Sequence, residues 1–267
     1  GGTLNLNSGT LVIGGDYRIQ KPDTANPGKY VHSIGRILMN NTSDYVLVHG
    51  DFVMDANYAH ASVSANAPLG KLEKGVLEVK GDFTQLSTSH YSPGVYTGNT
   101  TSINNFQASG EHKVVLSGDS LQTVHFEDYD GSNFNALVLN NTSDEGVAFI
   151  RPLHAKSLKS NDNKIASMSV YSVVLDDDAL VLGNLSLGTI NINGHTLKVK
   201  GGANLTSGTV NLASGTLNIQ EAVIHSGGTL NLNSGTLVIG GDYRIQKPDT
   251  ANPGKYVHSI GRILMNN

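Results

Sequence analysis

Apolar and polar residues alternate along short segments of this chain, and the segments recur every 20 residues. Three stretches that start at Thr189, Thr209 and Thr229 read TININGHTLKVKGGANLTSG, TVNLASGTLNIQEAVIHSGG and TLNLNSGTLVIGGDYRIQKP. Alternation with a period of two is the β-strand pattern, and the Gly, Ser and Asn residues that end each run favour turns. The pattern therefore predicts short strands joined by tight corners.

A less regular version of this pattern covers the N-terminal half. The blocks LVIGGDYRI (11–19), VLVHGDFVM (46–54) and LEVKGDFTQ (77–85) share their apolar positions. Each places a Gly-Asp pair before an aromatic residue. We expect the glycines to form one corner and the aspartates to be turn residues that face water. The positions are Gly15, Gly50 and Gly81 for the glycines, and Asp16, Asp51 and Asp82 for the aspartates.

Further strands are expected at 112–116, 122–126, 135–139 and 146–150. If Val115 aligns with Leu137 and Val124 with Val147, the chain returns to the same place every 22–23 residues. A chain that bends at Gly corners and returns every 20–23 residues can stack each strand on its equivalent, about 4.8 Å away. The prediction is an all-β fold, a right-handed parallel β-helix (β-solenoid) with coils of about 20–23 residues, because parallel crossovers are almost always right-handed.

Three segments interrupt the coil pattern and are expected to be loops inserted at corners. They are 21–32 and 55–74, which contain prolines, and 87–105, which is rich in Ser, Thr, Tyr and Gly. Insertions of this kind collect on one face of a solenoid, often the face that binds a partner.

A second, longer period encloses the first. Residues 1–41 and 227–267 are the same 41 letters. We interpret 1–226 as one full repeat and 227–267 as the start of the next, the product of tandem duplication. Because no initiator Met or targeting segment begins the sequence, we expect it to be cut from a longer array.

Polar columns are expected on the outside of the coils. Asn191, Asn211 and Asn231 share one position of the 20-residue period, and the threonines share others. We expect these side chains to hydrogen-bond along the axis, as in cross-β assemblies. Flat Thr and Asn rows also resemble those of ice-binding solenoids, although Lys198 and Lys200 interrupt the second face.

Composition narrows the range of functions. Charged residues make up 15% of the chain, the net charge is −4 and no basic run occurs, so nucleic acid is not an expected partner. The absence of cysteine excludes disulfides and thiol chemistry. No apolar stretch reaches the length of a membrane span. No nucleotide-binding or hydrolase motif is present, so no cofactor is expected.

Two acidic groups are weak candidates for calcium, since carboxylate oxygens are its preferred ligands. One is the run Asp176, Asp177 and Asp178, which a solvated turn explains equally simply. The other is the DYDGS segment with Asp128 and Asp130, which lacks the later ligands of a calcium loop.

Catalytic candidates are weaker still. The histidines show no ligand spacing; His112 and His125 would at most face each other across a corner, and a packed role is the simpler interpretation. Facing carboxylates on a β-helix would cleave polysaccharide, but spacing singles out no such pair. We therefore expect a protein that is not an enzyme and has no catalytic residue.

The Gly-Thr-Leu-x-Leu rungs, the Gly-Asp-aromatic corners and the stretch SGEHKVVLSGDSLQTVHFED resemble very large, repetitive bacterial cell-surface proteins, in the style of haemagglutinin-like adhesins with β-solenoid shafts. The resemblance implies secretion to the cell surface and a fibrous shape. We expect a structural filament or stalk, built from 226-residue repeats that stack axially on each other and bundle laterally through the loops. The alternative is an adhesin whose loops bind surface glycans, and a minor alternative is a polysaccharide-active enzyme.

Overall fold

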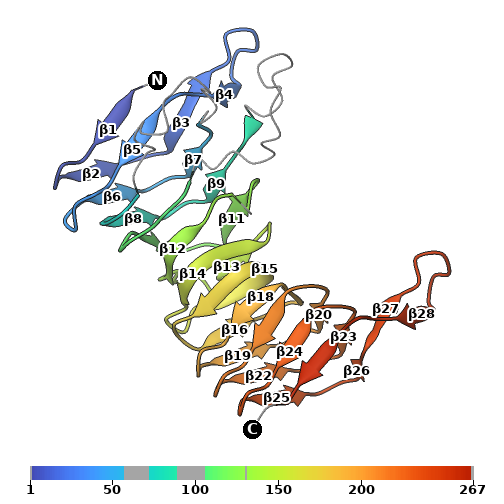
Figure 1. Cartoon of the computed structure of the whole chain (residues 1–267). Helices are drawn as coiled ribbons and strands as arrows, with labels where there is room; N and C mark the ends of the chain where they lie inside the picture. Colours follow the sequence, from blue (N-terminus) through green and yellow to red (C-terminus); the bar gives the residue numbers. More distant parts are fainter. Residues whose placement is uncertain (1, 57–71, 89–105, 130, 266–267) are drawn as a thin grey trace, which may run out of the picture.

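The computed structural model describes residues 2–56, 72–88, 106–129 and 131–265. These residues form β-strands, turns and irregular segments, without an α-helix (Figure 1). Parallel pairing dominates the strands, and the two termini lie at opposite ends of the molecule (Figure 1). The predicted all-β class is confirmed. Within the described residues there is accordingly no helix that is long and apolar enough to cross a membrane.

The C-terminal half contains three columns of parallel strands, and one pass of the chain through all three is called a rung here. The first column consists of β18 (Thr189–Asn191), β21 (Thr209–Asn211), β24 (Thr229–Asn231) and β29 (Arg262–Leu264). The second consists of β16 (Ala179–Val181), β19 (Thr196–Val199), β22 (Thr216–Ile219) and β25 (Thr236–Ile239). The third consists of β17 (Leu185–Leu187), β20 (Ala203–Leu205), β23 (Val223–His225) and β26 (Tyr243–Arg244). Leu197 pairs with Leu217 and Leu217 with Leu237, so the predicted 20-residue register is confirmed.

The N-terminal half has two long columns of the same kind. One consists of β2 (Thr10–Ile13), β6 (Tyr45–Val48), β8 (Val76–Val79), β10 (Lys113–Leu116) and β12 (Phe134–Leu139). The other consists of β3 (Tyr17–Pro22), β7 (Phe52–Met54), β9 (Phe83–Gln85), β11 (Gln122–Phe126) and β13 (Val147–Phe149). β1 (Thr3–Asn5) pairs with β5 (Arg36–Leu38) beside them. The alignment of the three Gly-Asp-aromatic blocks is confirmed, since Tyr17 pairs with Phe52 and Phe52 with Phe83.

Two long strands join the halves. β14 (Leu153–Lys159) pairs with β12, and β15 (Lys164–Leu175) pairs with β13 and β14 on one side and with β16, β17 and β18 on the other. Here the rungs are shorter than predicted: Met168 pairs with Leu185, a return of 17 residues. The reason is that β15 runs through a corner without a turn.

Two predicted alignments are wrong in register. Val115 pairs with Val138 rather than Leu137, and Val124 pairs with Phe149 rather than Val147. The strands themselves were predicted correctly. The second error is a slip of two residues, which keeps the buried face, because Val147 and Phe149 both point inward. The first is a slip of one residue, which would pair the half-buried Val115 with the buried Leu137 on opposite faces of their strands.

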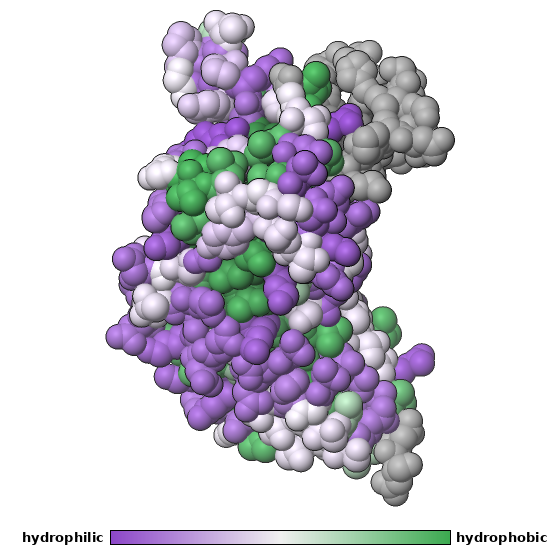
Figure 2. Space-filling view, turned by 90° about the vertical axis from the view of Figure 1, so that its left-hand side faces the viewer, coloured by the Kyte–Doolittle hydropathy of each residue, from purple (hydrophilic) through white to green (hydrophobic). Residues whose placement is uncertain are grey.

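Most buried side chains in the described residues are apolar, and a few polar ones, such as His112, Gln122 and His225, are buried among them. In the N-terminal half, aromatic rings fill the interior, with neighbouring ring centroids 4.7–6.1 Å apart in offset and edge-on contacts. The fully buried rings are Phe52, Phe83, Phe106, Phe126 and Phe134. In the C-terminal half, Val, Leu and Ile side chains of each rung take their place. Outside, hydrophilic residues cover most of the face in Figure 2, interrupted by hydrophobic patches.

The aspartates of the Gly-Asp corners are exposed or half-exposed, as predicted, but they also make hydrogen bonds that were not predicted. Asp16 Oδ1 accepts a hydrogen bond from the backbone N–H of Asp51 at 3.0 Å, and Asp51 Oδ1 accepts one from Asp82 at 2.9 Å. Asp82 Oδ1 in turn accepts the N–H of Thr123 at 2.8 Å. These carboxylates therefore tie each corner to the next rung.

The asparagine column behaves in the opposite way. Asn191, Asn211 and Asn231 stack in register as predicted. However, Asn191 Oδ1 accepts the N–H of Asn193 at 3.0 Å, and Asn211 Oδ1 accepts that of Ala213 at 3.2 Å. Both bonds lie within one rung, and they hold the next turn, where Asn193 and Ala213 have positive φ. The prediction that these oxygens bond along the axis is wrong.

The first predicted insertion, 21–32, forms a hairpin with the strand before it. β3 pairs antiparallel with β4 (Tyr30–His32), and the hairpin projects from the end of the molecule near the N-terminus (Figure 1). Its copy, β27 (Gln246–Pro248) and β28 (Tyr256–His258), does so near the C-terminus. The other two predicted insertions are 55–74 and 87–105. Most of each, residues 57–71 and 89–105, lies outside the described residues.

Candidate functional site at the repeat junction

The boundary between the two copies of the repeated sequence lies between residues 226 and 227. Strands β24, β25 and β26 belong to the second copy, and they pair with β21, β22 and β23 of the first repeat. The offset is the same 20 residues that separates rungs inside the repeat. Backbone pairing therefore crosses the boundary without a change of register.

A buried histidine lies at this boundary. His225 is fully buried at the end of β23, in the position that Leu205 occupies one rung earlier. Its Nε2 is 3.3 Å from the Gly228 carbonyl oxygen, and its Nδ1 is 2.7 Å from the Tyr243 hydroxyl. Because a carbonyl only accepts, Nε2 donates to Gly228, and Nδ1 accepts from Tyr243. The histidine of the first repeat is thus held by two groups of the second.

Burial favours the neutral forms of both side chains. Desolvation lowers the pKa of His225, opposed by hydrogen bonds to the backbone of Gly228 and Gly227. Desolvation also raises the pKa of Tyr243 to about 12. A neutral imidazole that accepts from a neutral phenol is the arrangement that this geometry needs.

Gly261 closes the site from the other side. A Cβ at this position would lie 2.5 Å from His225 Cδ2, so a larger residue would force the imidazole to move. The turn that positions Gly261 is local, since its N–H donates to Ser259 Oγ at 3.1 Å. In the first copy, Gly35 donates to Ser33 Oγ in the same way at 3.0 Å. The same turn therefore forms in both copies.

Each hairpin carries one arginine over one tyrosine ring. Arg18 lies 5.4 Å from the centroid of Tyr30, and Arg244 lies 5.5 Å from that of Tyr256. Each arginine also pairs with the corner aspartate, at 2.7 Å for Asp16 and 2.6 Å for Asp242. The repeated sequence thus builds the same exposed arm twice.

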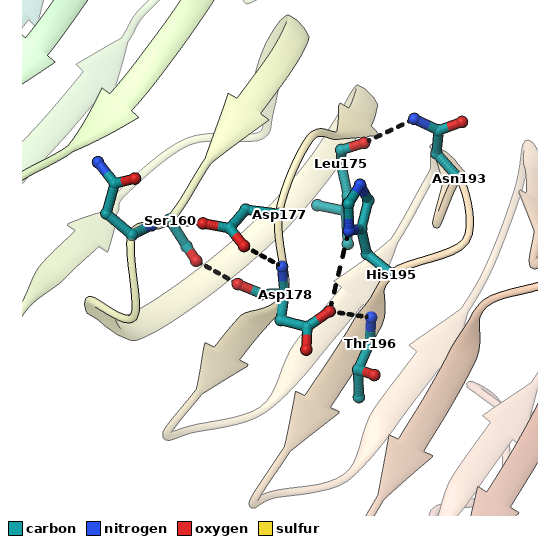
Figure 3. Close-up of polar contacts among 8 residues, drawn as sticks. Ser160, Leu175, Asp177, Asp178, Asn193, His195 and Thr196 are labelled. Atoms are coloured by element: carbon teal, nitrogen blue, oxygen red, sulfur yellow. Dashed lines mark hydrogen bonds and ion pairs between the residues drawn. The ribbon is translucent and has the colours of Figure 1, made fainter.

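The acidic run at 176–178 forms the corner between β15 and β16 (Figure 3). Asp177 Oδ1 accepts the N–H of Asp178 at 2.9 Å, and its Oδ2 accepts that of Asn161 at 3.1 Å. Ser160 Oγ donates to the Asp178 carbonyl oxygen. Asp176 is exposed, and its N–H donates to the Leu158 carbonyl at 2.9 Å.

Asp178 connects this corner to the following rung. Its Oδ1 accepts the N–H of Thr196 at 2.7 Å and lies 3.9 Å from His195 Nδ1 (Figure 3). The carboxylates of Asp177 and Asp178 therefore act as acceptors for backbone N–H groups, as Asp16 and Asp51 do. In the part of the chain that the structure describes, no three His, Asp or Glu side chains gather as metal ligands.

The second acidic candidate is far from the first along the chain. The N–H of Asp128 donates to Gln85 Oε1 at 3.0 Å, and its carbonyl accepts from Ser132 at 2.9 Å. Asp130 lies outside the described residues. The structure does not bring Asp128 together with the 176–178 run.

The two histidines considered as a pair have separate environments. His112 is fully buried, and its ring lies edge-on to Phe106 at 6.2 Å. Burial lowers the pKa of His112 to about 4. His125 lies in β11 in register with Thr84. Desolvation is the main cause that lowers the pKa of His125, and the positive charge of Arg151 is the second.

Sequence reasoning did not single out His225. One signal was present: in the 20-residue alignment, His225 stands where the previous rung has Leu205. A histidine at an interior position requires partners, and Tyr243 and Gly228 are those partners.

Comparison with known proteins gives no further guide. No family model matches this chain, and searches of curated proteins and of solved structures found no match.

Proposed function

We propose that this chain belongs to a structural protein, a long extracellular filament or stalk made of tandem 226-residue repeats wound as a right-handed parallel β-helix. The observation that carries the proposal is the junction, where the 20-residue register passes from one copy into the next. Equal units that stack with equal register extend a fibre without a weak point.

The two contexts of the repeated sequence support axial stacking. In the second copy, one edge of β24 and β25 is paired with the rung of β21 and β22. The first copy has the same letters in β1 and β2. An identical strand edge accepts an identical partner, so a preceding rung like that of β21 to β23 fits against β1 to β3.

The strand pairing sets the length of one repeat along such a filament. Nine inter-strand steps lead from β2 of the first copy to β24 of the second, so one repeat would be roughly 45 Å long. One hairpin arm would project per repeat, and its exposed Arg18 and Tyr30 are the groups we assign to lateral contacts between filaments. The proposal places the protein at a bacterial cell surface, on the basis of the resemblance alone, and assigns no catalytic residue.

Electron microscopy of chains with two, four and six repeats tests the proposal. We expect straight rods whose length grows by roughly 45 Å per repeat. Inserting a flexible Gly-Ser linker between residues 226 and 227 breaks the register and should turn each rod into separate beads. The matched control is the same linker at the hairpin turn beside Asn252, which should leave the rods unchanged. Beads in the parent chain would overturn the proposal.

A further inference from the structure

One corner of the shaft is hollowed. β15 and β17–β18 run in register there, with Met168 opposite Leu185 and Ser172 opposite Thr189. Tyr171 is therefore opposite Gly188. Where one rung presents a phenol ring, the next presents no side chain, and a Cβ on Gly188 would collide with the Val170 carbonyl oxygen.

The following rung restores the corner with extra residues. Leu187 and Leu205 are paired, and each ends a strand before the corner. In the first rung Gly188 alone fills the corner before Thr189. In the next rung the three residues 206–208 fill it before Thr209. Gly208 has a φ of +74°, which lets this longer corner turn outward over Gly188. The one-residue corner at Gly188 thus lies between Tyr171 of the preceding rung and the longer corner 206–208 of the following rung.

The result is an open recess of about 520 Å³, within the size range of small-molecule sites. It is lined by His154, Val170, Tyr171, Ser172, Gly188, Thr189, Ser207 and Gly208. None of these residues is Asp, Glu, Lys or Arg, which disfavours a charged ligand. Four of them, Tyr171, Ser172, Thr189 and Ser207, carry hydroxyl groups, which both donate and accept hydrogen bonds.

The aromatic wall is held in place. Tyr171 is 41% exposed and lines the recess, so part of its side chain is accessible to a ligand. Its ring meets Tyr129 at 5.4 Å and His154 at 5.1 Å, both edge-on. His154 is itself fixed, because its Nδ1 donates to the Tyr129 carbonyl oxygen at 3.1 Å. The tyrosine is a preorganised flat surface and loses little freedom on binding.

We propose that this recess binds a neutral saccharide, with the apolar face of one sugar ring on Tyr171 and its hydroxyls on Ser172, Thr189 and Ser207. The combination of a fixed aromatic face with uncharged hydroxyl groups matches the two surfaces of a pyranose. The site lies on the shaft itself and not on the inserted loops, so the inference goes beyond the filament role and does not depend on it.

Saturation-transfer NMR and calorimetry on the whole chain test this, with maltose, cellobiose and chitobiose as neutral probes and digalacturonate as the charged probe. At least one neutral disaccharide should bind in the millimolar range or tighter, with little dependence on salt because no ionised carboxylate or amine lines the recess. Tyr171→Ala should weaken binding at least about tenfold, whereas Tyr171→Phe should retain it.

The matched control is Tyr30→Ala, which removes another exposed tyrosine and should leave binding unchanged. Thr189→Val removes a hydroxyl at constant shape and should weaken binding about fivefold, which keeps the test decisive if Tyr171→Ala fails to fold. Absence of binding to every neutral probe would overturn the proposal. So would preference for digalacturonate, or equal loss of binding in Tyr30→Ala and Tyr171→Ala.

Discussion

His225 Nδ1 lies 2.7 Å from the hydroxyl of Tyr243, across the boundary between two copies of one sequence. The first copy contains the same tyrosine as Tyr17, which packs edge-on against Phe52 at 5.8 Å. The two tyrosines share their flanking sequence, and in this chain the structure shows Tyr243 beside the preceding β23 and Tyr17 beside the following β7. This gives the junction an internal control.

Replacing Tyr243 by Phe should weaken the junction. The imidazole of His225 loses its donor, and a lost hydrogen bond to a buried group costs about 1 kcal/mol. Amides of β23 and β26 should then exchange hydrogen faster in native-state measurements. The control Tyr17→Phe should leave those amides unchanged, and equal effects of the two substitutions would contradict the role given to His225.

Stability should fall as the solution is acidified from pH 6.5 to about pH 4. His112 has a pKa of about 4 in the folded chain, below its ordinary 6.5, because burial disfavours the charged ring. The unfolded chain therefore binds a proton first, and the stability present above pH 6.5 is lost progressively down to pH 4. The full loss is about 3 kcal/mol.

Replacing His112 by Leu should reduce this dependence, measured as the denaturation midpoint against pH. The remainder should come from His125 and His225, whose pKa values are lowered in the same direction. An unchanged slope in His112→Leu would rule out this assignment.

Removing the carboxylate of Asp51 should loosen the corner that follows it. In Asp51→Ala the N–H of Asp82 loses its acceptor, and we expect a loss of about 1 kcal/mol in the free energy of unfolding. Asp51→Asn keeps an Oδ1 and should be nearly neutral. Asn184 is a natural precedent, since its Oδ1 accepts the N–H of Gly202 at 2.8 Å. Equal loss in the two variants would show that charge matters rather than the acceptor.

Chelation of calcium should leave the melting temperature unchanged. The carboxylates of Asp177 and Asp178 already accept hydrogen bonds from backbone N–H groups. Asp178→Ala should lower stability by about 1 kcal/mol, because the Thr196 N–H loses its acceptor. A rise in melting temperature on adding calcium, absent in Asp178→Ala, would contradict this and restore the metal interpretation.

The linear sequence determined the strand positions, the inward residues and the long repeat. Alternation reports which face of a strand is buried, so Leu197, Leu217 and their equivalents could be placed in the interior without coordinates. The 20-residue register followed because those rungs have equal corners. Identity of 1–41 with 227–267 predicted the continuous junction.

Only the tertiary structure decided what happens between rungs. Whether Asp16 reaches the next corner while Asn191 holds its own turn depends on where each side chain lies relative to its neighbour. The 17-residue spacing between Met168 and Leu185 arises because β15 continues through a corner as one strand. Alternation of apolar and polar residues carries no information about the length of a corner. The contact of His225 with Tyr243 and the recess beside Tyr171 both join residues of different rungs, whose proximity arises from stacking.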